Sequence, residues 1–301
     1  TSTSMARARN HVVTMLLAAL AVCCTALCSL QEARAQVEED RPHILVTPVE
    51  GAIGPPVTRH IEAVIAEGTQ RGAALVVLRM DTPGGLTTST RDINRAILSA
   101  EVPVAVHVAP AGARAASAGT YILYASHVAA MAEGTNLGAA TPVTMGGGSP
   151  LPGGDGAPEG DGDETGAGAS GGPAETRDPG ARKRIEDAVA SIRALAELRG
   201  RNADWAERAV REAASLTARQ ALKRNVIDHI ASDTAALAAQ ADGASVDVDG
   251  VERTLALADP RIETVEPTLV TRILSVLANP NVALLMMTLG FYGLLYELAS
   301  P

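Results

Sequence analysis

A serine within a turn of small residues is the first feature of this sequence that could carry chemistry. Ser117 lies in the stretch 115–120 (AASAGT), after the apolar run 102–108 and before a helical run, 121–126. Small neighbours let the backbone turn sharply, and N–H groups at a helix start can donate to an oxyanion formed at a substrate carbonyl. The stretch predicts either a nucleophilic serine or a tight turn in which the serine caps a helix.

A serine hydroxyl attacks a carbonyl efficiently only when a general base takes its proton. Histidine is the usual base, and the chain has six. His127 follows Ser117 by ten residues, which is ~15 Å along a helix and too far for a hydrogen bond. His107 is expected to be a residue of the preceding strand. No motif favours the others, which are His11, His43, His60 and His229.

Lysine is the alternative base, and the sequence has only Lys183 and Lys223. A Ser–Lys dyad needs a neutral amine, which burial and a helix N-terminus achieve by lowering the pKa of a lysine. Arginine cannot replace it because its guanidinium stays protonated. Lys183 lies in the first turns of an expected helix and is the candidate base, with an ordinary surface lysine as the alternative. Lys223, near an expected helix end, is expected to be solvated.

The elements that would position Ser117 alternate between strands and helices. Residues 74–80 (ALVVLRM) form an almost continuous apolar run, typical of a strand buried on both faces of a parallel sheet. The alternation predicts an α/β layered domain, in which ligands bind beyond the carboxyl ends of the strands. The turn 81–85 (DTPGG) and the Ser117 turn both fall there. The expected strands are 44–49, 74–80, 102–108, 128–131 and 226–230; the expected helices are 57–66, one through Ile93 and Ile97, 121–126, 185–198 and 203–213.

Composition divides the chain into segments. Residues 1–35 are typical of a secretory signal peptide that ends in an A-x-A pattern, with a retained membrane anchor as the alternative. Residues 36–268 are expected to form the main domain, in which the Gly/Pro/Asp-rich stretch 144–180 is a disordered loop and 243–258 a loose linker. Residues 269–301 are expected to hold a transmembrane segment, because 273–296 carry no charge. Pro280 implies a kink or a helix start there, and a buried core helix is the alternative.

Charge and cysteine content exclude several classes of function. Lys and Arg total 25 against 34 Asp and Glu, a net charge of −9 without a basic patch, so nucleic acid is not an expected partner. The cysteines, Cys23, Cys24 and Cys28, all lie in the expected signal segment. Its removal would leave no disulfide, thiolate metal site or cysteine nucleophile. We expect neither a metal nor a cofactor.

Three motifs in a fixed order resemble the NfeD family. They are residues 81–85 (DTPGG), 115–120 (AASAGT) and 195–202 (LAELRGRN), and the similarity covers about residues 44–282. The NfeD family comprises membrane-bound serine proteases of the Clp-protease/crotonase superfamily that are partners of stomatin-type proteins. The resemblance implies an α/β, Clp-protease/crotonase-like spiral βαβ domain followed by a C-terminal transmembrane segment.

The same resemblance implies roles for particular residues. Ser117 corresponds to the nucleophile, and Lys183, seventeen residues before Gly200, to the base. Gly84 and Gly85, with the N–H of Ala118, correspond to the oxyanion hole. Clp proteases use a histidine about 25 residues after the serine, which falls near Pro142 here. This departure argues against a Ser-His-Asp triad and is consistent with the dyad.

The family's activity implies an ATP-independent endopeptidase that cleaves hydrophobic segments of stomatin- or prohibitin-like membrane proteins. It implies a bacterial-type inner membrane location with the protease domain on the extracytoplasmic, periplasmic side, and it allows a homodimer. Two other functions stay open: a non-catalytic scaffold that binds stomatin-like proteins through the same groove, and a crotonase-type acyl-CoA enzyme. The signal segment argues against the latter, since coenzyme A is cytosolic.

Overall fold

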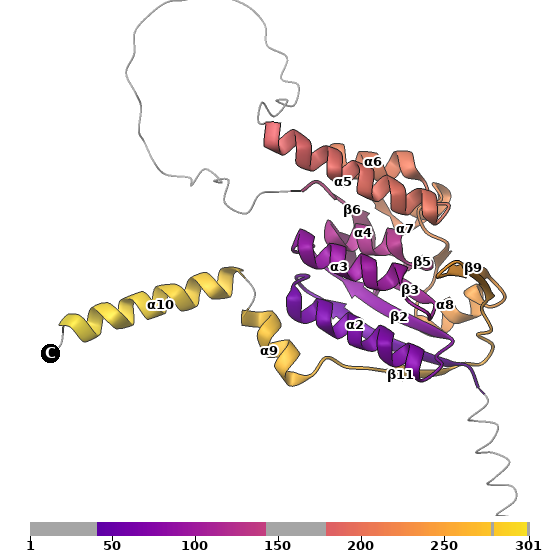
Figure 1. Ribbon diagram of the computed structural model, residues 1–301, viewed down its shortest axis with the longest axis horizontal. Helices are drawn as coiled ribbons and strands as arrows, with labels where there is room; N and C mark the ends of the chain where they lie inside the picture. The colour runs from indigo at the N-terminus through magenta and orange to yellow at the C-terminus, as the bar shows by residue number, and fades with distance from the viewer. Residues whose placement is uncertain (1–40, 143–178, 278–279, 300–301) are drawn as a thin grey trace, which may run out of the picture.

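The computed structural model describes residues 41–142, 179–277 and 280–299 (Figure 1). The expected signal peptide, 1–35, and nearly all of the expected loop, 144–180, lie outside the described residues. The predictions about those two segments therefore stay predictions.

A six-stranded, entirely parallel sheet forms the centre of the described structure, in the order β11–β1–β2–β3–β5–β8. The expected mixed α/β architecture is confirmed, and strands β1, β2, β3 and β5 lie where apolar runs predicted them. β8 is shorter than expected, and β11 was not predicted. The strands are β1 (His43–Glu50), β2 (Leu75–Asp81), β3 (Val104–Val108), β5 (Val128–Met131), β8 (His229–Ile230) and β11 (Arg261–Thr264).

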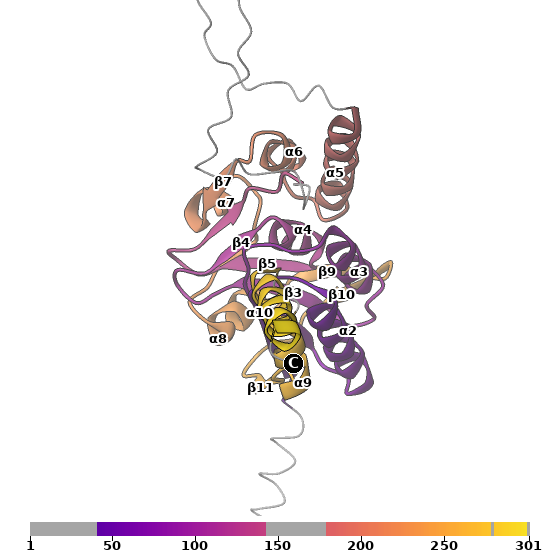
Figure 2. The ribbon, with the colours of Figure 1, turned by 90° about the vertical axis from the view of Figure 1, so that its left-hand side faces the viewer.

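Helices cover both faces of this sheet because its strands alternate their apolar side chains between two cores. On one face, Leu78 and Met80 pack in a core with Ile61 of α2 and Ile93 of α3. On the other, Val77 shares a smaller core with residues of α8. Figure 2 shows α2 and α3 on one side of the sheet and α8 on the other. The helices of the domain are α2 (Pro55–Gln70), α3 (Thr87–Leu98), α4 (Ala118–Ala125), α5 (Pro179–Leu198), α6 (Ala203–Arg211), α7 (Ala218–Lys223) and α8 (Thr234–Ala241).

Two smaller sheets were not predicted from the sequence. β4 (Arg114–Ala116) pairs in parallel with β6 (Asn136–Gly138), which pairs antiparallel with β7 (Ser215–Thr217). Ser117 thus follows the short strand β4, not the apolar run 102–108 directly. The expected loose linker contains a hairpin of β9 (Ser245–Val248) and β10 (Val251–Thr254).

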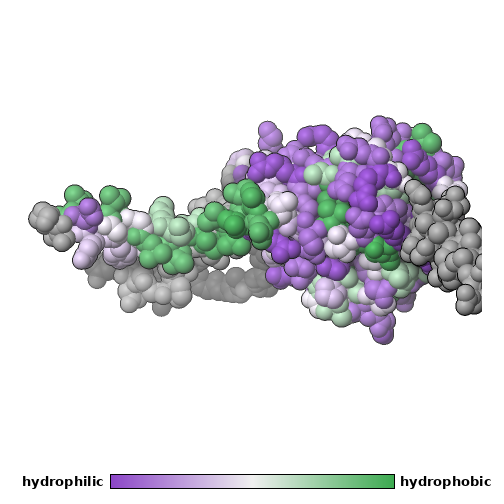
Figure 3. Space-filling view, turned by 90° about the horizontal axis from the view of Figure 1, so that it is seen from below, coloured by the Kyte–Doolittle hydropathy of each residue, from purple (hydrophilic) through white to green (hydrophobic). Residues whose placement is uncertain are grey.

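The C-terminal residues form two exposed apolar helices, α9 (Leu269–Leu277) and α10 (Pro280–Ala299). α10 begins at Pro280, one of the two outcomes expected there. None of the described helices alone meets the length and hydropathy required to cross a membrane; residues 269–277 and 282–298, bent by 71°, meet them only as a pair. α10 projects from the rest of the described structure, and Figure 3 shows that its surface is largely hydrophobic.

Candidate active site

Ser117 occupies a strained turn between β4 and α4. Its backbone has φ 49° and ψ −111°, and its N–H donates to the carbonyl of Gly138 at 3.0 Å. A non-glycine residue with positive φ costs of the order of 1–3 kcal/mol, and such residues cluster at functional sites. The strand–serine–helix turn predicted from the sequence is therefore present, and the half-buried Ser117 does not have the extended backbone of an ordinary helix cap. No hydrogen bond from the Ser117 side chain caps the helix.

The small residues around Ser117 are required by close packing. A Cβ on Gly119 would lie 2.7 Å from Thr82 Cγ2, so a larger residue would push α4 away from the β2 end. The hydroxyl oxygen of Thr120 lies 2.9 Å from the carbonyl oxygen of Ala115 and 3.1 Å from that of Gly138, which share its one proton, and it accepts the N–H of Gly138 at 3.1 Å. These bonds attach the first turn of α4 to β4 and β6 and hold the serine turn rigid.

The turn 81–85 lies directly against Ser117, as the shared carboxyl ends of the strands predicted. The N–H of Thr82 donates to Arg114 O at 2.8 Å, and the N–H of Ala116 donates to Thr82 O at 3.1 Å. Gly84 has φ +119°, and a Cβ there would lie 2.7 Å from Ser117 Cβ. A Cβ on Gly85 would lie 2.0 Å from the carbonyl oxygen of Ile53. Only glycine fits at these two positions.

Two N–H groups beside Ser117 are available as oxyanion donors. Ala118 is the first residue of α4, so its N–H has no partner within the helix. The N–H of Gly84 donates to Thr82 Oγ1 at 3.0 Å, and that of Leu86 donates to the carbonyl of Ile53 at 2.9 Å. Among the hydrogen bonds described for this turn, the N–H of Gly85 makes none. Gly85 is thus a better donor candidate than Gly84.

Two hollows meet at Ser117. The α3–α5 cavity, of about 280 Å³, is bounded by Gly85, Ser117 and residues of α3, α4 and α5. The α2-side groove, of about 610 Å³, is bounded by Gly84, Gly85, Ser117, several prolines and aliphatic residues, and Ser275 of α9. An extended chain with its carbonyl at Ser117 would therefore find space for side chains on both sides.

Lys183 lies on the helix that borders the α3–α5 cavity, but its side chain is exposed and does not line it. The structure brings together Ser117, Ala118, Gly84 and Gly85, and it does not place Lys183 among them. The neighbouring Arg184 does line the cavity. Lys223, at the end of α7, is exposed as expected.

Two buried histidines of the described chain, His107 and His127, take structural positions away from Ser117. His107 is buried within β3, its Nε2 lies 3.0 Å from the carbonyl of Ala231, and burial lowers its pKa. His127 Nδ1 accepts the N–H of Val104 at 3.1 Å. Burial, then the nearby Arg199, lowers the pKa of His127 to about 3. Both rings are neutral at physiological pH, and neither lines a hollow at Ser117.

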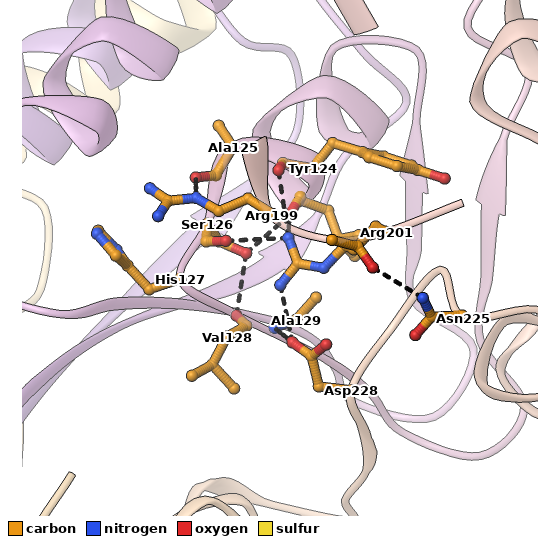
Figure 4. Close-up of polar contacts among 12 residues, drawn as sticks. Tyr124, Ala125, Ser126, His127, Val128, Ala129, Arg199, Arg201, Asn225 and Asp228 are labelled. Carbon is orange, nitrogen blue, oxygen red and sulfur yellow. Dashed lines mark hydrogen bonds and ion pairs between the residues drawn. The ribbon is translucent and has the colours of Figure 1, made fainter. Parts of the chain in front are cut away.

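A buried arginine holds the far end of α4, a role that the sequence did not predict for the motif 195–202. Arg201 Nη1 donates to the carbonyls of Leu123, Tyr124 and Ser126 at 3.1, 3.2 and 2.9 Å, and Nη2 donates to Asp228 Oδ2 at 2.7 Å (Figure 4). A cation at a helix C-terminus interacts favourably with the helix dipole. The helix that carries Ser117 at its start is thereby fixed at its end.

Comparison with known proteins confirms the resemblance to NfeD proteins. Residues 43–150 match the family model for the N-terminal domain of NfeD1b. The chain is 30% identical over 260 residues to the membrane-bound protease PH1510 of Pyrococcus horikoshii, and 32% identical over 118 residues to the membrane protein NfeD1b of Bacillus subtilis. These matches cover 86% and 39% of the chain. The chain spans about half (53%) of the length of the first relative and 26% of the second.

Solved structures similar to this fold are forms of the 1510-N membrane-bound stomatin-specific protease. A lysine-to-alanine mutant in complex with a substrate peptide matches with TM-score 0.64 and 27% identity, over 78% of this chain and 97% of that chain. A serine-to-alanine mutant matches with TM-score 0.63 and 29% identity, over 76% and 99%. The mixed α/β fold with a parallel sheet is therefore shared with that protease domain.

Proposed function

We propose that the chain is a membrane-bound serine endopeptidase, because residues 43–150 match the model of the NfeD1b N-terminal domain and the chain is 30% identical over 260 residues to a membrane-bound protease. The observation that carries this proposal is the strained Ser117 turn packed against Gly84 and Gly85. That arrangement offers a hydroxyl, two N–H donors and a hollow on each side, which are the parts that acyl transfer from a peptide requires.

In the proposed mechanism, Ser117 Oγ attacks the scissile carbonyl carbon while Lys183, as a neutral amine, accepts the hydroxyl proton. The N–H groups of Gly85 and Ala118 stabilise the oxyanion, and the lysine ammonium then gives its proton to the leaving amine. Water hydrolyses the acyl-enzyme by the same steps. Lys183 is exposed, so this role requires the first turns of α5 to approach Ser117 when substrate fills the cavity. Catalytic hydrogen bonds often tighten only in the substrate complex.

We further propose that the substrate is an apolar segment of a stomatin-like membrane protein, cleaved without ATP. The apolar α2-side groove supports this class of substrate, and Ser275 of α9 at its edge brings the groove next to the exposed apolar helices. We propose that α9 and α10 hold the domain at the membrane, on its extracytoplasmic side. The parallel sheet with a small second sheet at the catalytic turn is consistent with a Clp-protease/crotonase-like spiral, and a homodimer remains part of the proposal.

The experiment that tests this proposal measures cleavage and binding separately. The full chain in detergent is incubated with a peptide from the C-terminal region of a stomatin-like protein, and the products are identified by mass spectrometry. Ser117→Ala, Lys183→Ala and Lys183→Arg should each abolish cleavage, while Ser117→Ala should still bind the peptide. Lys223→Arg is the matched control and should cleave normally.

The outcomes test Lys183 as the base and distinguish the protease from the scaffold function. Full cleavage by Lys183→Arg would exclude Lys183 as the base, because arginine cannot accept the proton. Binding without cleavage by the wild-type chain would favour the scaffold function over the protease.

A further inference from the structure

α9 turns a polar side toward the domain. Thr271 and Ser275 are the only partly buried residues of α9, and because they are four residues apart they share one face of the helix. Both line a cavity of about 420 Å³ between α9, α2 and the end of β1. Ser275 also borders the α2-side groove, and its hydroxyl donates to the carbonyl of Thr271 at 2.8 Å. The side of α9 that faces the domain therefore carries small polar side chains.

The apolar residues of α9 point away from the domain. All six are 40–76% exposed; they are Leu269, Val270, Ile273, Leu274, Val276 and Leu277. A helix on the surface of a soluble domain normally turns its apolar stripe to the core, so α9 is arranged the other way round. Its one charged side chain, Arg272, forms an ion pair with Glu266 at 2.7 Å. The outward surface, called here the apolar face of α9, is of the kind that marks contact with a protein or a membrane.

α10 indicates which of these two covers the apolar face of α9. Leu284, Leu285, Met286 and Met287 are consecutive, and each is more than half exposed. Consecutive residues of a helix point about 100° apart, so these four side chains reach every side of α10. A second copy of the chain would cover one side and leave the others in water, whereas lipid surrounds a helix. Only two residues separate α9 from α10, and the matched relatives are named as membrane proteins, so lipid is the medium that suits both helices.

We propose that α9 lies in the membrane–water interface, with its apolar face in the lipid, and thereby sets the α2-side groove against the bilayer surface. This inference rests on the proposed protease function and adds to membrane attachment the direction in which the site opens. The axes of α9 and α10 are bent by 71°. With α10 inserted along the bilayer normal, α9 therefore lies within about 20° of the membrane plane, as an interfacial helix does.

The position of α9 defines the class of substrate. Ser275 and Ser117 border the same groove of about 610 Å³. A hollow of this volume is roughly 10 Å across, a length that about three residues of extended chain span. The substrate is therefore a membrane protein that is cleaved within a few residues of the point where its chain leaves the bilayer.

The first experiment measures the depth of α9 and does not depend on catalysis. The full chain is reconstituted in phosphatidylcholine vesicles, with or without bromine near the top of the acyl chains, because brominated lipid quenches a tryptophan that enters it. The one native tryptophan, Trp205, is buried in the domain and gives a constant background. In Ile273→Trp, the added fluorescence should fall by at least half in the brominated vesicles. Leu198→Trp, at an equally exposed position at the end of α5, is the matched control and should not be quenched.

The second experiment measures where the site opens. Two membrane-inserted substrates carry the same stomatin-derived sequence, separated from the transmembrane segment by about four or about twenty Gly/Ser residues. In vesicles, wild-type kcat/KM should be about tenfold higher for the short spacer, because effective concentration falls as roughly the −3/2 power of linker length. Ile273→Glu places a charge in the lipid and should remove this preference, while cleavage of a soluble peptide in detergent stays at the wild-type rate. Leu198→Glu is the control and should keep the preference.

Each result bears on the inference separately from the protease function. Absence of quenching in Ile273→Trp overturns the interfacial position, and a blue-shifted but unquenched emission assigns the apolar face of α9 to a second copy of the chain or another protein. Equal cleavage of both spacers, faster cleavage of the long one, or a preference unchanged in Ile273→Glu overturns the direction of the groove. Failure of the wild-type chain to cleave any peptide, including the soluble one in detergent, overturns the proposed function itself, and the quenching experiment still decides where α9 lies.

Discussion

Substitution of Arg201 by methionine should destabilise the domain more than any other single arginine change at the end of α4. The guanidinium is almost fully buried, with 2% of its side chain exposed, whereas its partner Asp228 is 35% exposed. Methionine can fill much of the same volume, so the loss reports mainly on the hydrogen bonds and the charge.

The magnitude follows from the contacts. Arg201 donates four hydrogen bonds: two to carbonyls of α4, one to the carbonyl of Ser126, which caps that helix, and one to Asp228. The three carbonyls lie on buried residues, but Asp228 can be partly rehydrated and also accepts the N–H of Ala129 at 2.7 Å. Breaking a buried ion pair typically costs 3–5 kcal/mol, so we expect about 4 kcal/mol for Arg201→Met.

The assay is urea unfolding of the full chain in detergent, followed by the fluorescence of Trp205. If the free energy of unfolding falls by about 2 kcal/mol per M urea, the urea concentration at the unfolding midpoint should fall by roughly 2 M. Arg199→Met is the control, because Arg199 is only half-buried and bonds the carbonyls of Ala125 and Asp247, at 3.0 Å each. Its loss should be about 1–2 kcal/mol. A midpoint for Arg201→Met equal to or higher than that for Arg199→Met would refute the reasoning.

Three further outcomes are expected. Gly85→Ala places a Cβ 2.0 Å from Ile53 O and should lower kcat at least ~100-fold by displacing the turn; wild-type kcat would contradict this. Burial lowers the pKa of His127 to about 3 in the folded chain. The stability that the neutral, buried ring contributes is therefore fully present above pH 6.5 and is lost as the pH falls towards 3. The free energy of unfolding should therefore fall by up to ~1.4 kcal/mol per pH unit below 6.5, and His127→Gln should flatten urea midpoints measured from pH 7.5 to 5.5; an unchanged slope would exclude His127 as the source. Tyr124→Phe removes the hydroxyl that donates to Asn202 O at 3.0 Å and should cost about 1 kcal/mol, measurable as a lower urea midpoint with the Tyr292→Phe variant as the control.

The strands that the sequence predicted are those buried on both faces. β2 and β3 read as continuous apolar runs because helices cover each side of the sheet. The missed strands β4, β6 and β11 have three or four residues, too few for a periodic pattern. They form because their neighbours present unpaired backbone groups, and that information is in the tertiary structure alone.

The residues at and around the candidate site likewise fall into those that the sequence could predict and those that it could not. Gly84 and Gly85 could be predicted because a tight turn requires glycine, and Ser117 could be predicted because small residues surround it. Arg201 could not, since a charged residue after a glycine reads as a solvated helix end. Its burial becomes visible only when α4 and β8 lie beside it.

The turn 81–85 and the turn at Ser117 are joined by a backbone contact that cannot be predicted from either segment alone. β3 is adjacent to β2 in the sheet, yet the chain leaves β3 and returns through β4 before it reaches Ser117. The bridge between Thr82 and Ala115 closes this detour and sets Gly84 against the serine Cβ. Since α4 is then attached to β6 through Thr120 and capped at its other end by Arg201, the hydroxyl and both N–H donors belong to one rigid unit. α5 carries Lys183 and packs on that unit from outside, with Arg91–Asp187 as one of its links to α3. It follows that the proposed nucleophile and the proposed oxyanion donors are preorganised by the fold, whereas the position of the proposed base, Lys183, is set by the packing of a separate helix.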